Sequence, residues 1–465
     1  MKISKKFTFV LTFIFILTVS VSHTRRSGHK NDSGEQWWLT TGSIVRLVPA
    51  REKNTIKDYI AMLPKLAADG FKVIDLYAPY HGGVEYGGLD PIDFYSVRSG
   101  IGSFEDIRAF IKAAHALDMK VISFLNLGYS AVNHPDFIKA CADVKKGVQS
   151  RERDMFVWAD EPYEMERPLA PHFQQDNSND GGWVYSEAAG KYYYSRWFGT
   201  GGNTKLPQYW FGSKVWRDEC TRIMQFWREV GFDGFIIDAV NWYTGCDWDT
   251  NYDVIIKPAF EKGELFMQPE GAGGNRDEPV SWITKGHYSC VQDYSLNAWW
   301  HEIDIIGDCM KTGDASALWP VLESYRNRVV EAGGVVYMGL GQGRGIRRTA
   351  AELQLECALL VAIGEIINFN LRNWENLGNA ELTKIFKLQT SYSALAPSGK
   401  RELISIDGKP SVFALRCIDG KKGADIVTIF NFGSTAYTHN IAGSKITVAP
   451  MKCAFVSSDG KVVIY

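Results

Sequence analysis

Two carboxylates stand where a pair of side chains could carry out acid–base chemistry. Asp238 directly follows the apolar run 234–237, and Glu270 directly follows the run 265–269. If these runs are neighbouring parallel strands, their ends bring the two side chains to about 5 Å, the separation used for retaining cleavage of a glycosidic bond. One carboxylate would attack the anomeric carbon, and the other, with a raised pKa, would protonate the leaving oxygen and later activate water. The alternative is that both are structural ion-pair partners, and the residues alone leave both interpretations open.

The elements that must position this pair alternate along the chain. Short runs rich in Val, Ile and Phe occur at residues 43–47, 73–77, 121–125, 235–237, 265–267, 335–338 and 366–369. Runs that are apolar on both faces and are separated by helical segments predict a parallel sheet. The length and regularity of the alternation favour a (β/α)8 TIM barrel, whose functional residues lie at the carboxyl ends of the strands.

One step of this repeat can be followed residue by residue. The segment 103–106, Ser-Phe-Glu-Asp, has the pattern of a capping box that begins a helix. Apolar side chains then recur at helical spacing, at Ile107, Phe110, Ile111, Ala114 and Leu117. We expect this helix to end before Asp118 and the strand 121–125 to follow it, which is one βαβ step.

Two further regions depart from the repeat. The stretch between residues 125 and 235 is too long for one loop and one helix and is rich in Trp and Tyr, so it predicts a small subdomain inserted after the third strand, at about 127–212, followed by a helix at about 214–230. After about residue 382, the runs 411–416, 424–430 and 452–457 are separated by Asp-Gly and Gly-Ser turns, as in an antiparallel sheet. We predict a barrel domain at 36–382 and a C-terminal β domain at 383–465.

The N-terminus carries the pattern of an export signal. Lys2, Lys5 and Lys6 precede the apolar run 7–22, which ends in the small residues Ser20 and Ser22. The run is shorter than the roughly 20 residues that a membrane-spanning helix needs. We therefore expect a signal peptide at 1–22, a disordered lead-in at 23–35, and a secreted or periplasmic protein with no stable membrane span after cleavage. A signal anchor is the alternative.

Composition narrows the range of partners. The formal net charge of −2 gives no reason to expect nucleic acid or an anionic membrane, whereas 13% aromatic residues offer many flat faces for stacking on sugar rings. The 8 cysteines are scattered, with no Cys-x-x-Cys pair or Cys/His cluster, so no structural zinc site is expected. Which cysteines pair in an oxidising compartment is left open. We expect a carbohydrate substrate and no cofactor, and the oligomeric state is left open as well.

Several motifs, taken in order, give the chain a family resemblance. They are QWW at 36–38, GLDPIDFYSV at 88–97, HPDF at 134–137, RDMFVW at 153–158 and FWREVGFDGF at 226–235. The series is similar to the α-amylase family of glycoside hydrolases, and most similar to its α-glucosidase and oligo-1,6-glucosidase branch, over almost the whole chain after the leader. The resemblance implies a retaining hydrolase or transglycosylase of an α-linked oligo- or polysaccharide, with Asp238 as nucleophile and Glu270 as general acid/base.

The rest of the family's sugar site is replaced in this chain. The Arg two positions before the nucleophile is Ile236, and the Tyr that packs on the sugar is Leu89. The third-strand Asp and Asn-His fall on Phe124 and on residues 128–129, and the seventh-strand Asn-His-Asp falls on residues 339–341. In the family, side chains that bind the sugar hydroxyls contribute to transition-state binding. Because these side chains are replaced here, we expect a plain α-glucoside to be a poor substrate. The calcium loop is replaced by residues 51–54, so no metal is expected there.

Other groups near the predicted strand ends could take over the missing sugar contacts. These candidates are Tyr86, Asn126, Tyr129, Asn241, Trp242, Gln342 and Arg344. For each residue taken alone, a packing or loop-capping role is the alternative.

Two other classes of function stay open. The replaced sugar site would also suit a catalytically inactive sugar-binding protein on the same scaffold. The third possibility is a membrane-anchored partner subunit like the amino-acid-transporter heavy chains, which resemble this family without its activity. The N-terminus discriminates between them, because those chains have a longer cytoplasmic tail and a full membrane span.

Overall fold

The computed structural model describes residues 36–83, 87–165, 168–169, 182–195, 197–198, 205–271, 278–298, 303–339, 348–377, 380–419, 425–441, 444–457 and 460–464. The predicted signal peptide and lead-in lie outside these ranges, as do the candidate site residues Tyr86, Gln342 and Arg344. By its internal contacts, the chain from Gln36 to Tyr465 forms one unit.

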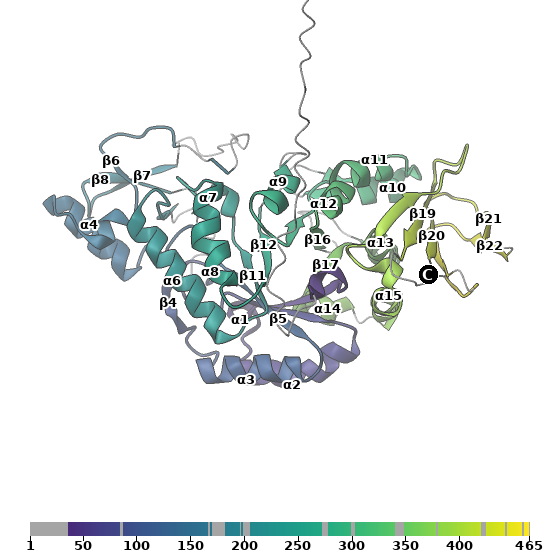
Figure 1. The fold of residues 1–465 in the computed structure, drawn as a ribbon, viewed down its shortest axis with the longest axis horizontal. Helices are drawn as coiled ribbons and strands as arrows, with labels where there is room; N and C mark the ends of the chain where they lie inside the picture. The colour runs from purple at the N-terminus through teal and green to yellow at the C-terminus, as the bar shows by residue number, and fades with distance from the viewer. Residues whose placement is uncertain are drawn as a thin grey trace, which may run out of the picture. The chain divides into compact units, whose positions relative to one another are not determined.

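A parallel sheet of eight strands lies at the centre of the described chain, in the order β12-β11-β5-β2-β1-β17-β16-β13. The strands are β1 (Ser43–Leu47), β2 (Val73–Tyr77), β5 (Lys120–Leu125), β11 (Gly234–Ile237), β12 (Phe266–Pro269), β13 (Cys290–Gln292), β16 (Val335–Gly339) and β17 (Ile366–Asn370). The amide of Ser289 donates to the carbonyl of Met267 at 2.9 Å, which joins the two ends of this order. The sheet therefore closes, and the predicted (β/α)8 barrel is confirmed (Figure 1).

The strands that carry the two carboxylates are buried and closely packed. All four residues of β11 and all four of β12 are buried, as expected for parallel strands covered on both faces. Gly234 lies so close to β12 that a Cβ added to it would stand 2.4 Å from the carbonyl oxygen of Phe266. A glycine is needed here because the two backbones approach each other too closely for a side chain.

Helices follow most of the barrel strands. They include α2 (Ile56–Ala68), α3 (Phe104–His115), α6 (Lys214–Val230), α8 (Lys257–Phe260), α9 (Glu278–Thr284), α12 (Arg328–Glu331), α13 (Ala350–Ile363) and α15 (Ala380–Ser391). The shorter helices are α1 (Pro49–Glu52), α7 (Trp248–Asn251), α10 (Ile305–Thr312), α11 (Leu318–Leu322) and α14 (Leu371–Leu377). The capping box predicted at Ser103 is present, since its side chain accepts from the amide of Asp106 and the Asp106 carboxylate accepts in return. Helix α6 has the bounds expected from the sequence.

Between β5 and α6 the chain builds additional structure, in the region where the sequence predicts an insertion. Two helices, α4 (Pro135–Lys146) and α5 (Arg151–Asp154), precede a three-stranded antiparallel sheet of β6 (Trp158–Ala159), β8 (Lys191–Tyr194) and β7 (Trp183–Ser186). A short pair of strands, β9 (Trp197–Phe198) and β10 (Lys205–Leu206), follows. A hairpin of β3 (Tyr80–Gly82) and β4 (Pro91–Val97) extends from the end of β2.

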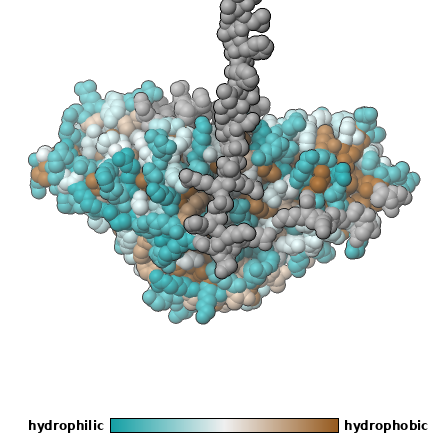
Figure 2. All heavy atoms as spheres, viewed as in Figure 1, coloured by the Kyte–Doolittle hydropathy of each residue, from teal (hydrophilic) through white to brown (hydrophobic). Residues whose placement is uncertain are grey.

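The C-terminal region is an antiparallel sheet in the order β18-β19-β20-β23-β24. Its strands are β18 (Lys400–Leu403), β19 (Val412–Ile418), β20 (Ile426–Asn431), β23 (Lys452–Ser457) and β24 (Val462–Ile464), with a separate hairpin of β21 (Tyr437–Ile441) and β22 (Ser444–Val448). Helix α15 crosses residue 382, where the sequence places the start of this domain. In Figure 2 hydrophobic side chains gather over this sheet, whereas hydrophilic ones cover much of the helical side.

A buried arginine joins the C-terminal sheet to the barrel. The guanidinium of Arg401 on β18 donates to carbonyls that include those of Ala362 at 2.5 Å, Ala394 at 2.9 Å and Ala396 at 3.1 Å. Because Ala362 belongs to α13, these bonds hold the sheet against a barrel helix.

The eight cysteines all lie among the described residues, where each is buried and none forms a disulfide with another. None of the helices in the described ranges combines the length and the apolar character needed to cross a membrane.

Candidate active site

Asp238 and Glu270 lie at the carboxyl ends of adjacent strands. Strands β11 and β12 pair in parallel, with Ile237 opposite Pro269, so the next residue on each strand reaches the same end of the barrel. The amide of Asp238 donates to the carbonyl of Leu125 at 2.8 Å, and the amide of Glu270 donates to the carbonyl of Ile237 at 2.8 Å. The backbones of both residues therefore continue the sheet, which gives the two side chains rigid starting points.

The carboxylate of Glu270 is anchored beside Asp238. Its Oε2 accepts a hydrogen bond of 3.0 Å from the amide of Ala239, the residue that follows Asp238. Ala239 has φ 42°, in the left-handed region that non-glycine residues rarely adopt, and it begins the 3-10 turn Val240–Trp242. This unusual backbone conformation aims an amide at Glu270, and strain of this kind recurs at functional sites.

The electrostatic environment of Asp238 and Glu270 gives their carboxyl groups pKa values that differ from those of carboxyl groups on the surface. Asp238 is 7% exposed. Burial, together with the negative charge of Glu270, raises the pKa of Asp238 well above its usual value, while a hydrogen bond from Tyr129 and the positive charge of Arg46 lower it. Burial also raises the pKa of Glu270, against the amide of Ala239 and Arg46, which lower it. Two buried carboxyl groups that interact this closely lose their protons in separate steps, which provides an ionised base and a protonated acid together.

Beneath the carboxylates lies an ion pair inside the barrel. Arg46 on β1 donates from Nε to Oδ2 of Asp75 on β2 at 2.5 Å, and the Asp75 side chain is fully buried. Arg46 also donates to the hydroxyl of Tyr337 on β16 at 3.3 Å, and that hydroxyl is bonded by the amide of Asn368 on β17. The sequence patterns do not predict this network. The available signal was one charged residue in each of two apolar runs, 43–47 and 73–77.

Tyr129 and Asn126, two of the candidate sugar-binding residues, lie in the loop after β5. Tyr129 is brought to the site, where its hydroxyl bonds the carboxylate of Asp238. The Asn126 amide donates to the carbonyls of Leu89 at 3.1 Å and Tyr129 at 3.0 Å, and its Oδ1 accepts from the amide of Gly128 at 2.8 Å. Asn126 therefore shapes the loop that presents Tyr129. A contact of either residue with substrate stays a prediction.

Asn241 and Trp242 lie in the turn after Asp238. The Oδ1 of Asn241 is buried and has no hydrogen-bond partner among the described residues. That oxygen lies 2.8 Å from the place of a Cβ on Gly271, so the glycine after Glu270 leaves room for it. Trp242 is half-buried, and its carbonyl accepts from Nε2 of Gln208 at 2.5 Å. The turn thus places a buried acceptor without a hydrogen bond beside Gly271, the residue that follows Glu270.

Apolar side chains fill two positions where the family resemblance implies contacts with the sugar. Phe124 is buried and stacks on Tyr77 with ring centres 4.6 Å apart, and Leu89 is buried as well. The charge of Asp238 contributes to the raised pKa of Tyr77, Tyr80, Tyr243 and Tyr294, after burial as the main cause. The carboxylates therefore face a largely aromatic surrounding.

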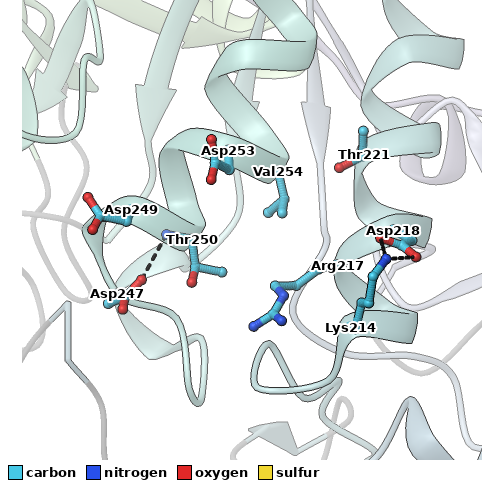
Figure 3. A pocket seen from close by; sticks show the side chains of 9 residues that line it. All are labelled: Lys214, Arg217, Asp218, Thr221, Asp247, Asp249, Thr250, Asp253 and Val254. Carbon is cyan, nitrogen blue, oxygen red and sulfur yellow. Dashed lines mark hydrogen bonds and ion pairs between the residues drawn. The ribbon is translucent and has the colours of Figure 1, made fainter.

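Two pockets are lined by residues other than the two carboxylates. Figure 3 shows one of about 410 Å³, where Lys214 and Arg217 of α6 face Asp247, Asp249 and Asp253 around α7. The other, of about 530 Å³, lies between residues 49–54 and the β3–β4 hairpin. None of the predicted site residues that the structure describes lines either pocket. Across the described ranges no three His, Cys, Asp or Glu side chains gather as metal ligands would, and the expected lack of a cofactor stays a prediction.

A closed (β/α)8 barrel with paired carboxylates at neighbouring strand ends has the layout of a glycoside hydrolase barrel. Residues 60–264 match the family model of the alpha amylase catalytic domain. The chain is 28% identical to Alpha-amylase 3 of Dictyoglomus thermophilum over 236 residues, which is 49% of this chain and 41% of that protein. It is 28% identical to an Alpha-glucosidase of Schizosaccharomyces pombe over 213 residues, 44% of this chain and 35% of that protein. Each match covers less than half of the relative's length.

Solved structures agree with these matches at the level of the fold. An alpha-amylase from H. orenii superposes with a TM-score of 0.68 at 16% identity, covering 86% of this chain and 91% of that one. A Bacillus licheniformis trehalose-6-phosphate hydrolase superposes with a TM-score of 0.67 at 14% identity, covering 93% and 99%. The match of residues 60–264 to the alpha amylase catalytic domain agrees with the family resemblance that the ordered motifs give.

Proposed function

We propose that this chain is a retaining glycoside hydrolase or transglycosylase that acts on an α-linked oligo- or polysaccharide. The observation that carries the proposal is the bond between Oε2 of Glu270 and the amide of Ala239, which holds one carboxyl group directly beside the other. The relatives support the substrate class, because their names describe an α-amylase, an α-glucosidase and a trehalose-6-phosphate hydrolase.

In this proposal the two carboxyl groups have different roles. Asp238, ionised and bonded by Tyr129, attacks the anomeric carbon while the bond from that carbon to the leaving oxygen breaks. Glu270 gives its proton to the leaving oxygen. In the second step Glu270 takes a proton from water or from an acceptor hydroxyl, whose oxygen attacks the anomeric carbon and releases Asp238. A water acceptor gives hydrolysis, and a sugar acceptor gives transglycosylation.

Export belongs to the same proposal. A polysaccharide substrate outside the cell would suit a secreted or periplasmic enzyme, which is what the basic and apolar start of the chain predicts.

The test is a glycan panel with amide variants. Wild type should cleave an α-linked member of the panel, and a plain aryl α-glucoside should be a poor substrate because the buried Phe124 and Leu89 cannot grip sugar hydroxyls. Asp238→Asn should nearly abolish turnover on every substrate, because the attacking carboxylate is gone. Glu270→Gln should nearly abolish turnover on natural glycans but keep the first step on an activated aryl glycoside, whose leaving group needs no proton.

A matched control lies on the same strand at its other end. Asp233 directly precedes β11, where it bonds the amide of Val121 at 2.8 Å and pairs with His115 at 2.7 Å. Asp233→Asn should lower the midpoint of thermal unfolding and leave turnover unchanged. Full activity in both amide variants of the pair would rule out the assignment. Binding of a glycan without cleavage would favour the inactive sugar-binding protein instead.

A further inference from the structure

The interior of this barrel contains charges where barrels are usually filled by branched apolar side chains. Arg46 is 17% exposed and its partner Asp75 is not exposed at all. Removing two charges from water costs more than their attraction returns unless the geometry is favourable, so a buried ion pair is weak evidence for a stabilising role. The Oδ1 atom of Asp75 has no hydrogen-bond partner among the described residues, which adds to that cost. The presence of the Arg46–Asp75 ion pair is therefore not explained by a contribution to the stability of the fold.

The guanidinium of Arg46 reaches across the barrel toward the strand that carries Asp238. Its Cζ lies 5.2 Å from the ring centre of Tyr77 on β2 and 4.9 Å from that of Phe124 on β5. Phe124 pairs with Ile236 on β11, two residues before Asp238. The side chain thus starts on β1, crosses β2, and ends above β5, the strand next to β11.

We propose that Arg46 is a positioning residue for the carboxylate pair, and that its guanidinium, held by Asp75 and Tyr337, supplies the positive charge that allows Asp238 to be ionised beside Glu270. This inference rests on the proposed function and deepens it. Two carboxyl groups in a buried site repel each other as soon as both lose their protons, and a nearby cation reduces that repulsion. Arg46 acts on both members, since its charge lowers the pKa of Asp238 and that of Glu270.

The other titratable groups that face the pair or its arginine, within the described ranges, are an aspartate and several tyrosines. They are Asp75, Tyr77, Tyr80, Tyr129, Tyr243, Tyr294 and Tyr337. Burial raises the pKa of Tyr77, Tyr80, Tyr243, Tyr294 and Tyr337, so these tyrosines stay neutral in the working range. The positive charge that acts on both Asp238 and Glu270 is that of Arg46.

Aromatic packing and the bond to Asp75 restrict where the charge can stand. The Arg46 guanidinium lies against two rings that are themselves stacked, and one edge is bonded to a carboxylate that cannot move into solvent. A planar, bonded cation of this kind keeps its place while protons are exchanged above it. The charge therefore needs no reorganisation during the reaction.

The test removes the ion pair as a unit, because removing one partner leaves a buried charge alone. Arg46→Met combined with Asp75→Asn should fold, since replacing a whole buried pair with neutral side chains of similar size is tolerated. The acid limb of the kcat/KM profile reports the ionisation of Asp238. We expect that limb to move upward by about one pH unit or more in the double variant, and Arg46→Lys to recover at least half of that displacement.

A matched control is Arg228→Met on the outer helix α6. The Arg228 side chain is 9% exposed and is paired with Glu229 at 2.6 Å and Glu261 at 2.8 Å, so it is a similarly buried and paired arginine at a distant site. Its replacement should lower the midpoint of thermal unfolding and leave the pH profile unchanged. An unchanged acid limb in the Arg46 and Asp75 double variant, with turnover retained, would overturn the inference.

A second readout needs no turnover and separates this inference from the proposed function. Arg46→Met and Asp75→Asn are introduced together into two backgrounds, wild type and a protein carrying Asp238→Asn and Glu270→Gln. In each background the free energy of unfolding is measured against pH with and without this double substitution. Loss of Arg46 raises the folded-state pKa of both carboxyl groups further, so stability present below pH about 4 is lost as pH rises from there toward the folded pKa. The extra loss between pH about 4 and about 7 should occur only where both carboxylates are present. Equal losses in the two backgrounds would contradict the role of Arg46, even if no glycan were cleaved.

Discussion

Tyr129 is the neighbour whose hydroxyl bonds the carboxylate of Asp238, and Tyr129→Phe removes that bond while keeping the ring. The ring is 1% exposed, and Asn126 bonds both the amide and the carbonyl of residue 129, so the loop should keep its conformation. A hydrogen bond to a charged group contributes about 1.5–3 kcal/mol. Since one pKa unit is about 1.4 kcal/mol, the pKa of Asp238 should rise by about one to two units in the variant.

The sign of the effect on activity follows from the role of Asp238. Attack requires the ionised carboxylate, so a higher pKa moves the acid limb of the kcat/KM profile upward by the same one to two units, to order of magnitude. At a pH below both limbs, kcat/KM should fall about tenfold for every pH unit by which the limb has moved, and it should approach wild type at higher pH. The assay is kcat/KM against pH on the glycan found by the panel.

A matched control is Tyr59→Phe on α2. Tyr59 is also fully buried, and its hydroxyl donates to the carboxylate of Glu52 at 2.5 Å, away from β11. This variant should lose stability and keep the pH profile of wild type. If Tyr129→Phe left the acid limb in place, or moved it downward, the assigned bond between Tyr129 and Asp238 would be refuted.

Three further predictions concern stability and processing. Asp238→Asn should raise the free energy of unfolding at pH 7 by about 1–3 kcal/mol in urea denaturation, because burial raises the pKa of Asp238 and the ionised carboxylate therefore destabilises the folded state. This gain in stability should vanish below pH about 4, where the carboxyl group is protonated in both the folded and the unfolded state, and a gain that persisted there would exclude this cause. Gly234→Ala should cost about 1–3 kcal/mol, since the new Cβ would stand 2.4 Å from the carbonyl oxygen of Phe266; an unchanged urea midpoint would contradict the close strand packing. N-terminal sequencing of exported protein should start between residues 23 and 35, whereas an intact Met1 on membrane-bound material would favour the anchored subunit.

Apolar runs predict seven of the barrel strands, and the structure adds β13. The missed strand, Cys290–Gln292, ends in a polar residue and has only two apolar residues, so its composition does not mark it as an apolar run. Its position depends on pairing with β16, where Cys290 lies opposite Val335. Such pairing is a tertiary property, so local pattern carries little information about it.

Some residues of the candidate site could likewise be predicted from the sequence, whereas others could not. Asp238 and Glu270 could be placed from the sequence because strand ends in a barrel meet at one edge, a rule that needs only the order of the strands. Arg46 and Asp75 could not be joined from the sequence, because each is a single charge in an apolar run and only the register of β1 against β2 sets them opposite each other. Asn126 could not be assigned a role from the sequence for a different reason. Its side-chain amide bonds the loop backbone, and an Asn that caps a loop cannot be distinguished by residue type from an Asn that binds a ligand.

The most direct measurement of the central claim is covalent capture of the nucleophile. Glu270→Gln protein would be incubated with an activated α-glycosyl fluoride, which forms the glycosyl-enzyme without needing a proton and releases it slowly when the acid/base is missing. The account predicts a mass increase of one glycosyl unit, mapped by peptide sequencing to Asp238 and absent from the variant that also carries Asp238→Asn. Fluoride release with no adduct, or an adduct on another residue, would contradict it.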